Sequence, residues 1–120
     1  MKETIHLFYT NDLHSYFDNW SQVATFIKSG RMDAAEKGET AWTLDIGDHM
    51  DRVHPLTEAT LGRANVALLN DLQYDLATLG NNEGITLSHE HLYNLYDEAD
   101  FHVVCSNLEC VRDKDPAWLQ

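Results

Sequence analysis

The chain has few basic residues: 8 Lys and Arg stand against 20 Asp and Glu, which gives a net charge of −12 over 120 residues. Such a surface repels phosphate backbones and anionic membranes, so this charge disfavours nucleic-acid binding through a basic face. No apolar run approaches the roughly 20 residues that a membrane-spanning helix needs, and the N-terminus has no stretch of signal-peptide length. We therefore expect neither a nucleic-acid nor a membrane partner.

Cysteine and proline are also scarce, with two residues of each. Cys105 and Cys110 form a lone C-x4-C pair, which falls short of the four ligands of a structural zinc site. We interpret them as free thiols in a reducing cytoplasm. Six glycines and two prolines argue against disorder or low complexity, and the length allows one domain.

Four apolar runs have the length of strands: residues 4–9, 41–46, 76–79 and 101–105. Between them lie segments with helical spacing of apolar residues, over 20–32, 64–72 and 88–95, the last with Ser88 as a candidate N-cap. This alternation predicts an α/β fold of parallel βαβ units. Continuous rather than alternating hydrophobicity further predicts strands that are buried on both faces.

Ligands of an open parallel sheet bind beyond the carboxyl ends of its strands. Asp12 and His14 follow the first run, Asp48 the second and Asn81 the third. A carboxylate next to an imidazole suits Zn, Mn or Fe, and a carboxylate such as Asp48 can hold two cations about 3.5–4 Å apart. Taken singly, each residue is explained as well by a turn or a helix cap. Asp45, inside the second run, is interpreted as orienting a ligand.

The three segments in their order resemble the calcineurin-like metallophosphoesterases, and within them the 5′-nucleotidase and 2′,3′-cyclic-nucleotide phosphodiesterase group. The similar blocks are Leu-Phe-Tyr-Thr-Asn-Asp-Leu-His, Leu-Asp-Ile-Gly-Asp and Gly-Asn-Asn-Glu. The resemblance covers nearly all of the chain. It implies half of an α/β/β/α sandwich, with residues 1–120 as the N-terminal part of the catalytic domain.

The resemblance also implies a function, the metal-dependent hydrolysis of nucleotide-like phosphomonoesters or phosphodiesters. Two divalent metal ions (Mn, Zn or Fe) would be held by Asp12 and His14, by Asp48 as the bridging ligand, and by Asn81. A water between the cations would attack phosphorus in line.

The sequence departs from the family pattern at Asn82, where the family has a histidine that assists the leaving group or holds the phosphate. An amide donates a hydrogen bond but supplies no proton at neutral pH. Ile85 replaces the aspartate that pairs with that histidine in the nucleotidases, so the pair has changed together. Asn82 is the first candidate catalytic residue. His49, beside the bridging Asp48, is the second, as a group that could approach substrate.

The family's later metal-ligand blocks, a lone histidine and a Gly-His-x-His segment, do not occur in these 120 residues. We therefore expect a fragment that is inactive alone. One alternative is a catalytically silent metal-binding or interaction fragment that self-associates through an exposed sheet edge. Another is a receiver-like phosphorylation domain, which would need an acceptor Asp after the third strand and a late lysine, for which only Lys114 is available.

Overall fold

The computed structural model describes residues 2–109 and 115–119 of the chain. In this part, four parallel strands form one sheet in the order β1-β2-β3-β4. The strands are β1 (Ile5–Thr10), β2 (Thr40–Asp45), β3 (Leu76–Ala77) and β4 (His102–Val103). Because the strands are parallel, the loops after β1, β2 and β3 leave the same end of the sheet.

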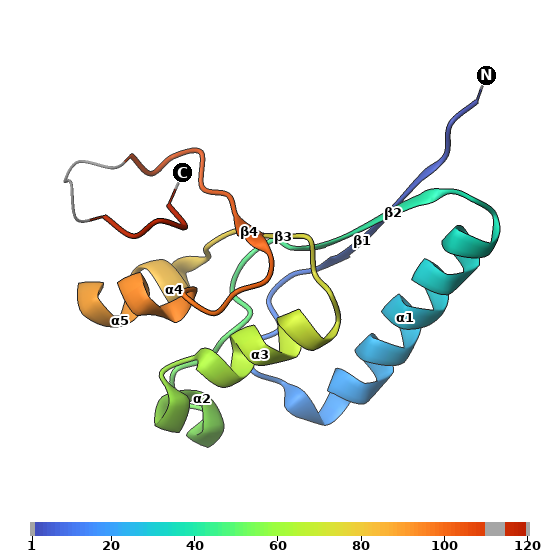
Figure 1. Cartoon of the computed structure of the whole chain (residues 1–120). Coiled ribbons are helices and arrows are strands. Elements are labelled where there is room, and N and C mark those ends of the chain that lie inside the picture. The colour runs from blue at the N-terminus through green and yellow to red at the C-terminus, as the bar shows by residue number, and fades with distance from the viewer. Residues whose placement is uncertain (1, 110–114, 120) are drawn as a thin grey trace.

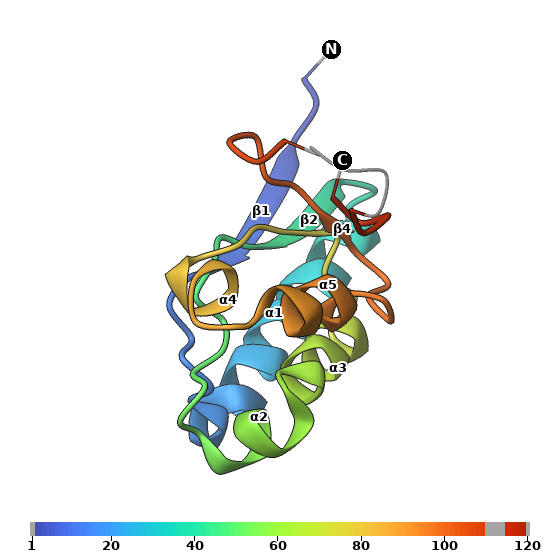
Figure 2. The ribbon, with the colours of Figure 1, turned by 90° about the vertical axis from the view of Figure 1, so that its left-hand side faces the viewer.

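Helical segments connect the strands. They are a 3-10 turn (Phe17–Asn19), α1 (Trp20–Glu36), α2 (Pro55–Thr60), α3 (Arg63–Asp71), α4 (Asn81–Gly84) and α5 (His89–Leu95). Figures 1 and 2 show α1, α3 and α5 on the same side of the sheet. At Gly30 of α1 a side chain would overlap the ring of Phe8, so glycine permits the close approach of α1 to β1.

The hydrophobic core lies between the sheet and these helices. Its buried members come from both layers: Ile27, Met50, Val66, Leu69, Leu72, Tyr74, Ala77, Leu95, Tyr96, Phe101 and Val103. Burial of this apolar surface is the main stabilising contribution to the fold. The core therefore holds one face of the sheet against the helices.

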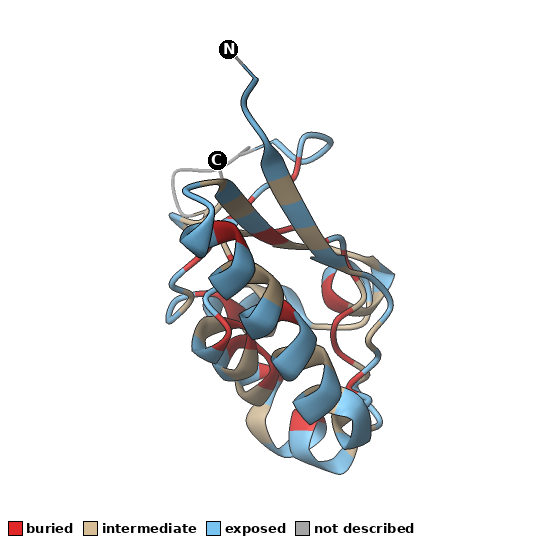
Figure 3. Cartoon of the chain, turned by 90° about the vertical axis from the view of Figure 1, so that its right-hand side faces the viewer, coloured by how far each residue is buried: buried red, intermediate tan, exposed pale blue. Residues whose placement is uncertain are grey.

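The other face of the sheet is uncovered in the described part of the chain (Figure 3). Along β1, Ile5, Leu7 and Tyr9 are 56%, 62% and 68% exposed, whereas the residues between them are half-buried. Trp42 is directly opposite Leu7 in the parallel register and is also exposed. The prediction of strands buried on both faces is thus wrong for these residues.

The α/β class and the parallel strands are confirmed, and the predicted helices are present, α1 extending four residues past Met32. Ser88 caps α5 by accepting a hydrogen bond from the His91 amide. The short helices α2 and α4 were not predicted, since four to six residues show too little periodicity. No helix in residues 2–109 and 115–119 combines the length and apolar character needed to cross a bilayer.

Candidate metal centre

Two loops meet beyond the ends of β1 and β2 and are joined by three successive backbone hydrogen bonds. The amides of Asp12, His14 and Ser15 donate to the carbonyls of Gly47, Asp48 and His49 over 3.1, 3.0 and 3.1 Å. These bonds continue the pairing of the two strands into the loops. Backbone hydrogen bonds therefore position Asp12, His14 and Asp48, independently of their side-chain interactions.

The backbone of these loops is held in an unusual conformation. Asp12, His14, Ser15 and Asp48 all have positive φ angles, of 54°, 46°, 54° and 55°. Residues with a Cβ rarely adopt this left-handed region, and such strain concentrates at functional sites because the surrounding structure must enforce it. Three of the four are residues that the sequence marks as metal ligands.

The side chains of Asp12, His14 and Asp48 converge. One potential ligand atom from each lies within 4.8 Å of the other two. His14 Nε2 is 3.3 Å from Asp12 Oδ1 and 3.9 Å from Asp48 Oδ2. The Asp12 and His14 side chains are 56% and 44% exposed, so the cluster is open to solvent.

Asn81 and Asn82 complete this group from the loop after β3. An atom of the Asn81 amide lies 3.0 Å from Asp48 Oδ2. If it is the nitrogen, it donates a hydrogen bond; if it is the oxygen, two ligand oxygens face each other, as they do around a shared cation. The backbone amide of Asn82 donates to Asp48 Oδ1 over 2.8 Å, and the side-chain Nδ2 of Asn82 lies 3.2 Å from His14 Nδ1. The structure thus brings four predicted ligands and Asn82 together.

The close approach of the Asp48 and Asn81 loops requires glycine at two positions. Gly47 has a φ of 105°, and a side chain there would lie 2.9 Å from the Gly80 nitrogen. At Gly80 a Cβ would overlap the Asp48 carboxylate. Neither position can take a side chain unless the loops separate.

We predict that Gly80→Ala lowers the free energy of unfolding by about 1–3 kcal/mol, the usual cost of overpacking, and displaces Asp48 from the cluster. Urea unfolding measures the first effect and Mn²⁺ titration followed by electron paramagnetic resonance the second. Gly84→Ala is the matched control, because nothing lies within 4 Å of a Cβ at Gly84. Equal unfolding midpoints for the two variants would contradict the prediction.

Glu83 joins the same two loops from inside the protein. Its carboxylate is fully buried and accepts hydrogen bonds from the amides of Asp48 and Met50, each 3.0 Å, and of Gly80, 2.8 Å. Bonds from backbone donors to a carboxylate are among the stronger ones in proteins. Glu83 therefore fixes the separation of the Asp48 and Asn81 loops. The sequence motif contains Glu83, but nothing in the sequence indicated this role.

Asp45 is buried at the end of β2, and its contacts hold the Thr10 side chain and the Gly47 backbone rather than a candidate ligand side chain. It accepts hydrogen bonds from the Thr10 hydroxyl over 2.6 Å and from the Gly47 amide over 3.0 Å. Burial raises the pKa of the Asp45 carboxyl, because removal from water disfavours its charged form. Burial likewise raises the pKa of Tyr74, whose hydroxyl bonds to Thr10, to about 12.

A raised carboxyl pKa makes a testable contribution to stability. The folded protein holds the Asp45 proton more tightly than the unfolded chain, so stability is present below the unfolded pKa and is lost as pH rises through the folded pKa. We predict that Asp45→Asn, which keeps a neutral group of the same shape, raises the urea midpoint at pH 7 and loses this advantage toward about pH 4. A midpoint difference that does not change with pH would contradict the prediction.

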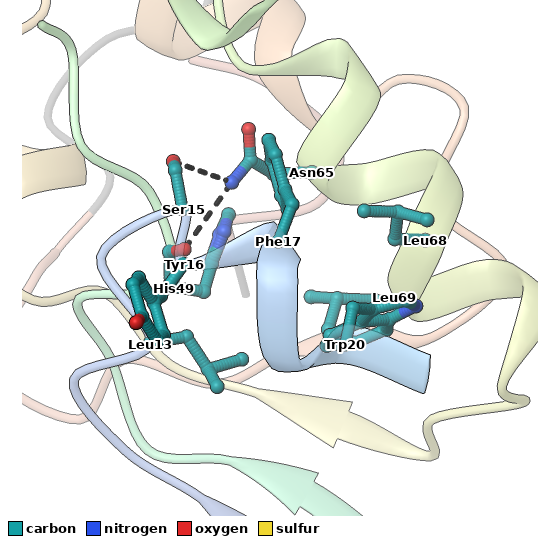
Figure 4. Close-up of a pocket in the computed structure, with 9 residues that line it drawn as sticks. All are labelled: Leu13, Ser15, Tyr16, Phe17, Trp20, His49, Asn65, Leu68 and Leu69. Carbon is teal, nitrogen blue, oxygen red and sulfur yellow. Dashed lines mark hydrogen bonds between the residues drawn. The ribbon is translucent and has the colours of Figure 1, made fainter. Parts of the chain in front are cut away.

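His49 lies in the interior and not with the open cluster. The residue is 2% exposed, and Nε2 is 3.0 Å from the Tyr96 hydroxyl and 3.8 Å from Glu83 Oε1. Nδ1 is buried and has no hydrogen-bond partner among the residues that the structure describes. The imidazole lines a small cavity of about 10 Å³ together with Leu13, Ser15 and Asn65, among others (Figure 4). In this arrangement His49 does not reach a substrate at the cluster, so the structure does not support that expectation.

The donors of this cluster fit a divalent cation. Two carboxylates, an imidazole and an amide supply the oxygen and nitrogen ligands that Mn, Zn and Fe accept. Cys105 is a buried free thiol, as the sequence predicts, and is not a member of this cluster. Cys110 lies outside the described residues.

Two known proteins are similar to this chain, one in sequence and one in structure. The chain is 51% identical over 118 residues to the uncharacterized metallophosphoesterase YunD of Bacillus subtilis, a match that covers 98% of this chain and 26% of that protein. A solved structure of the sulfate thiohydrolase SoxB of Thermus thermophilus superposes with a TM-score of 0.71 at 14% identity, over 87% of this chain and 30% of SoxB. No protein-family model matches the chain.

Over the region that it spans, the chain is therefore similar to a metallophosphoesterase. The SoxB likeness supports the fold alone: an α/β unit with a parallel sheet that corresponds to part of a metallophosphoesterase fold. The chain spans about a quarter of its Bacillus relative.

Proposed function

We propose that the chain forms the first part of a two-metal phosphoesterase centre that hydrolyses phosphomonoesters or phosphodiesters of nucleotides. The observation that carries the proposal is the convergence of Asp12, His14 and Asp48 within 4.8 Å at the ends of neighbouring strands. The nucleotide substrate rests on the motif resemblance to the 5′-nucleotidase group. The metallophosphoesterase relative supports the reaction class.

The described residues have distinct parts in this proposal. Asp12 and His14 would hold one cation, Asn81 the other, and Asp48 both. Cations in such a site act as Lewis acids on the phosphoryl oxygens and lower the pKa of a water. Asn82 lies beside His14 and would donate a hydrogen bond to a phosphate oxygen. An amide cannot protonate a leaving group, so this help, worth on the order of 10²–10⁴ in rate, would have to come from elsewhere.

The four ligands do not fill two coordination shells, because each divalent cation takes four or more donors. We propose that the chain corresponds to the N-terminal part of the catalytic domain, that it binds metal weakly and that it is inactive alone. A catalytically silent metal-binding fragment is the alternative function. The exposure of Asp12 and His14 is compatible with both.

A parallel assay separates these possibilities. The 120-residue chain and the Bacillus relative are tested with Mn²⁺, Zn²⁺ or Fe²⁺ on p-nitrophenyl phosphate and its bis ester, and Mn²⁺ binding is measured for the chain and for Asp48→Asn. We expect turnover by the relative only, and Mn²⁺ binding that Asp48→Asn removes. Turnover by both would show that the chain is active alone. Absence of both turnover by the relative and Mn²⁺ binding would refute the phosphoesterase proposal.

The receiver-like alternative finds no support at the end of β3. Gly80, Asn81 and Asn82 occupy the position of the acceptor Asp, and the late Lys114 lies outside the described residues.

Localisation in the cytoplasm remains a prediction.

A further inference from the structure

Three buried polar side chains form a closed hydrogen-bonded ring behind the candidate metal centre. Ser15, Thr57 and Asn65 are 2%, 0% and 3% exposed. The two hydroxyls are 2.8 Å apart, Thr57 Oγ1 is 2.9 Å from Asn65 Oδ1, and Asn65 Nδ2 is 3.0 Å from Ser15 Oγ. Figure 4 shows the Asn65 amide directed at Ser15 from α3. None of the three was indicated as a site residue by the sequence.

The direction of every bond in the ring is fixed by the groups around it. Ser15 Oγ accepts from Asn65 Nδ2 and from the Asp51 amide, the latter over 2.7 Å, so its own proton is directed to Thr57. Thr57 then donates to Asn65 Oδ1. The second proton of Asn65 Nδ2 goes to the His49 carbonyl over 3.2 Å. Each donor is used, and a change at one member leaves the others with buried unpaired groups.

The ring connects the two loops that carry the candidate ligands. Ser15 follows His14, and both have positive φ angles. The His49 carbonyl follows Asp48 and accepts from both Asn65 Nδ2 and the Ser15 amide. Two consecutive left-handed residues persist only where neighbouring contacts enforce them. Asn65, on the rigid helix α3, supplies a side-chain contact to each loop.

We propose that Asn65 is a positioning residue of the metal centre. Through the ring with Ser15 and Thr57 it holds the left-handed His14–Ser15 turn against the Asp48 loop, and so sets the separation of His14 from Asp48. As far as it concerns metal, this inference rests on the proposed function. The ring itself is a property of the chain that can be measured without metal.

The test uses four variants of the 120-residue chain. Asn65→Asp removes both donors at nearly constant shape, and Thr57→Val removes the hydroxyl without adding charge. Thr57→Ser restores the hydroxyl and is the rescue variant. Asn70→Asp is the matched control on the same helix, because Asn70 Nδ2 also donates to a carbonyl, that of Glu98, over 2.7 Å. Amide hydrogen exchange of residues 11–16 and 47–51 and Mn²⁺ affinity are measured for each folded variant.

We expect Asn65→Asp and Thr57→Val to speed exchange in both segments at least about tenfold and to weaken Mn²⁺ binding about 10–100-fold, as loss of supporting contacts does in metal sites. Thr57→Ser and Asn70→Asp should match the wild-type chain. Exchange in the two loops no faster than in Asn70→Asp would overturn the inference, and so would unchanged Mn²⁺ affinity. If exchange rises but no form binds Mn²⁺, the ring holds the loops as inferred while the proposed metal function fails.

Discussion

Replacing Glu83 with alanine is expected to lower the free energy of unfolding by roughly 3–9 kcal/mol, because it leaves three backbone amides without their acceptor, each at a cost of about 1–3 kcal/mol. The amides are those of Asp48, Met50 and Gly80, and the carboxylate that serves them is fully buried. Small domains have only about 5–15 kcal/mol in total. The variant should therefore be close to the limit of folding.

Urea unfolding of Glu83→Ala and Glu83→Gln measures this effect. The glutamine keeps one acceptor oxygen but turns an NH₂ group toward the remaining donors, so we expect an intermediate loss. Glu90→Ala is the control, because Glu90 is an exposed residue of the same acid type on α5. A loss below about 0.5 kcal/mol, as for a surface substitution, would show that the amides find other partners.

The convergence of the candidate ligands was predictable from the sequence because they follow separate strands in a parallel fold. No single residue among Asp12, His14, Asp48 and Asn81 indicated a site. The carboxyl ends of parallel strands lie at the same end of the sheet. Residues that directly follow such strands are therefore expected to lie close together. Asn82 was named for a different reason, because it stands where the resembled family has a histidine, and the structure places it beside His14.

The supporting contacts were not predictable, because they depend on which side chains become buried opposite each other. Asn65 lies on the face of α3 that buries Val66 and Leu69. A polar residue within such an apolar face is the sequence signal for a buried hydrogen-bond network. His49 was misplaced for the same reason. Its position next to Asp48 does not reveal that its side chain turns toward Tyr96.

We expect the 120-residue chain to self-associate through the uncovered face of its sheet. Parallel sheets are almost always covered on both faces, yet here Ile5, Leu7, Tyr9 and Trp42 present adjacent apolar side chains to solvent. In addition, β1 is an edge strand. The net charge of −12 opposes association, so we expect it to strengthen when salt screens this repulsion.

Analytical ultracentrifugation between about 10 and 200 µM, in low salt and in about 0.5 M NaCl, tests this expectation, since association follows mass action and screening follows ionic strength. The double variant Leu7→Lys/Trp42→Lys places two charges on cross-strand partners and should remain monomeric. Met32→Lys/Val53→Lys makes the same change of charge at residues that are 63% and 71% exposed away from the sheet face, and should associate like the wild type. A wild-type chain that stays monomeric in both salts would mean that the exposed face is tolerated in water. Equal association of the two double variants would place the contact on another surface of the molecule.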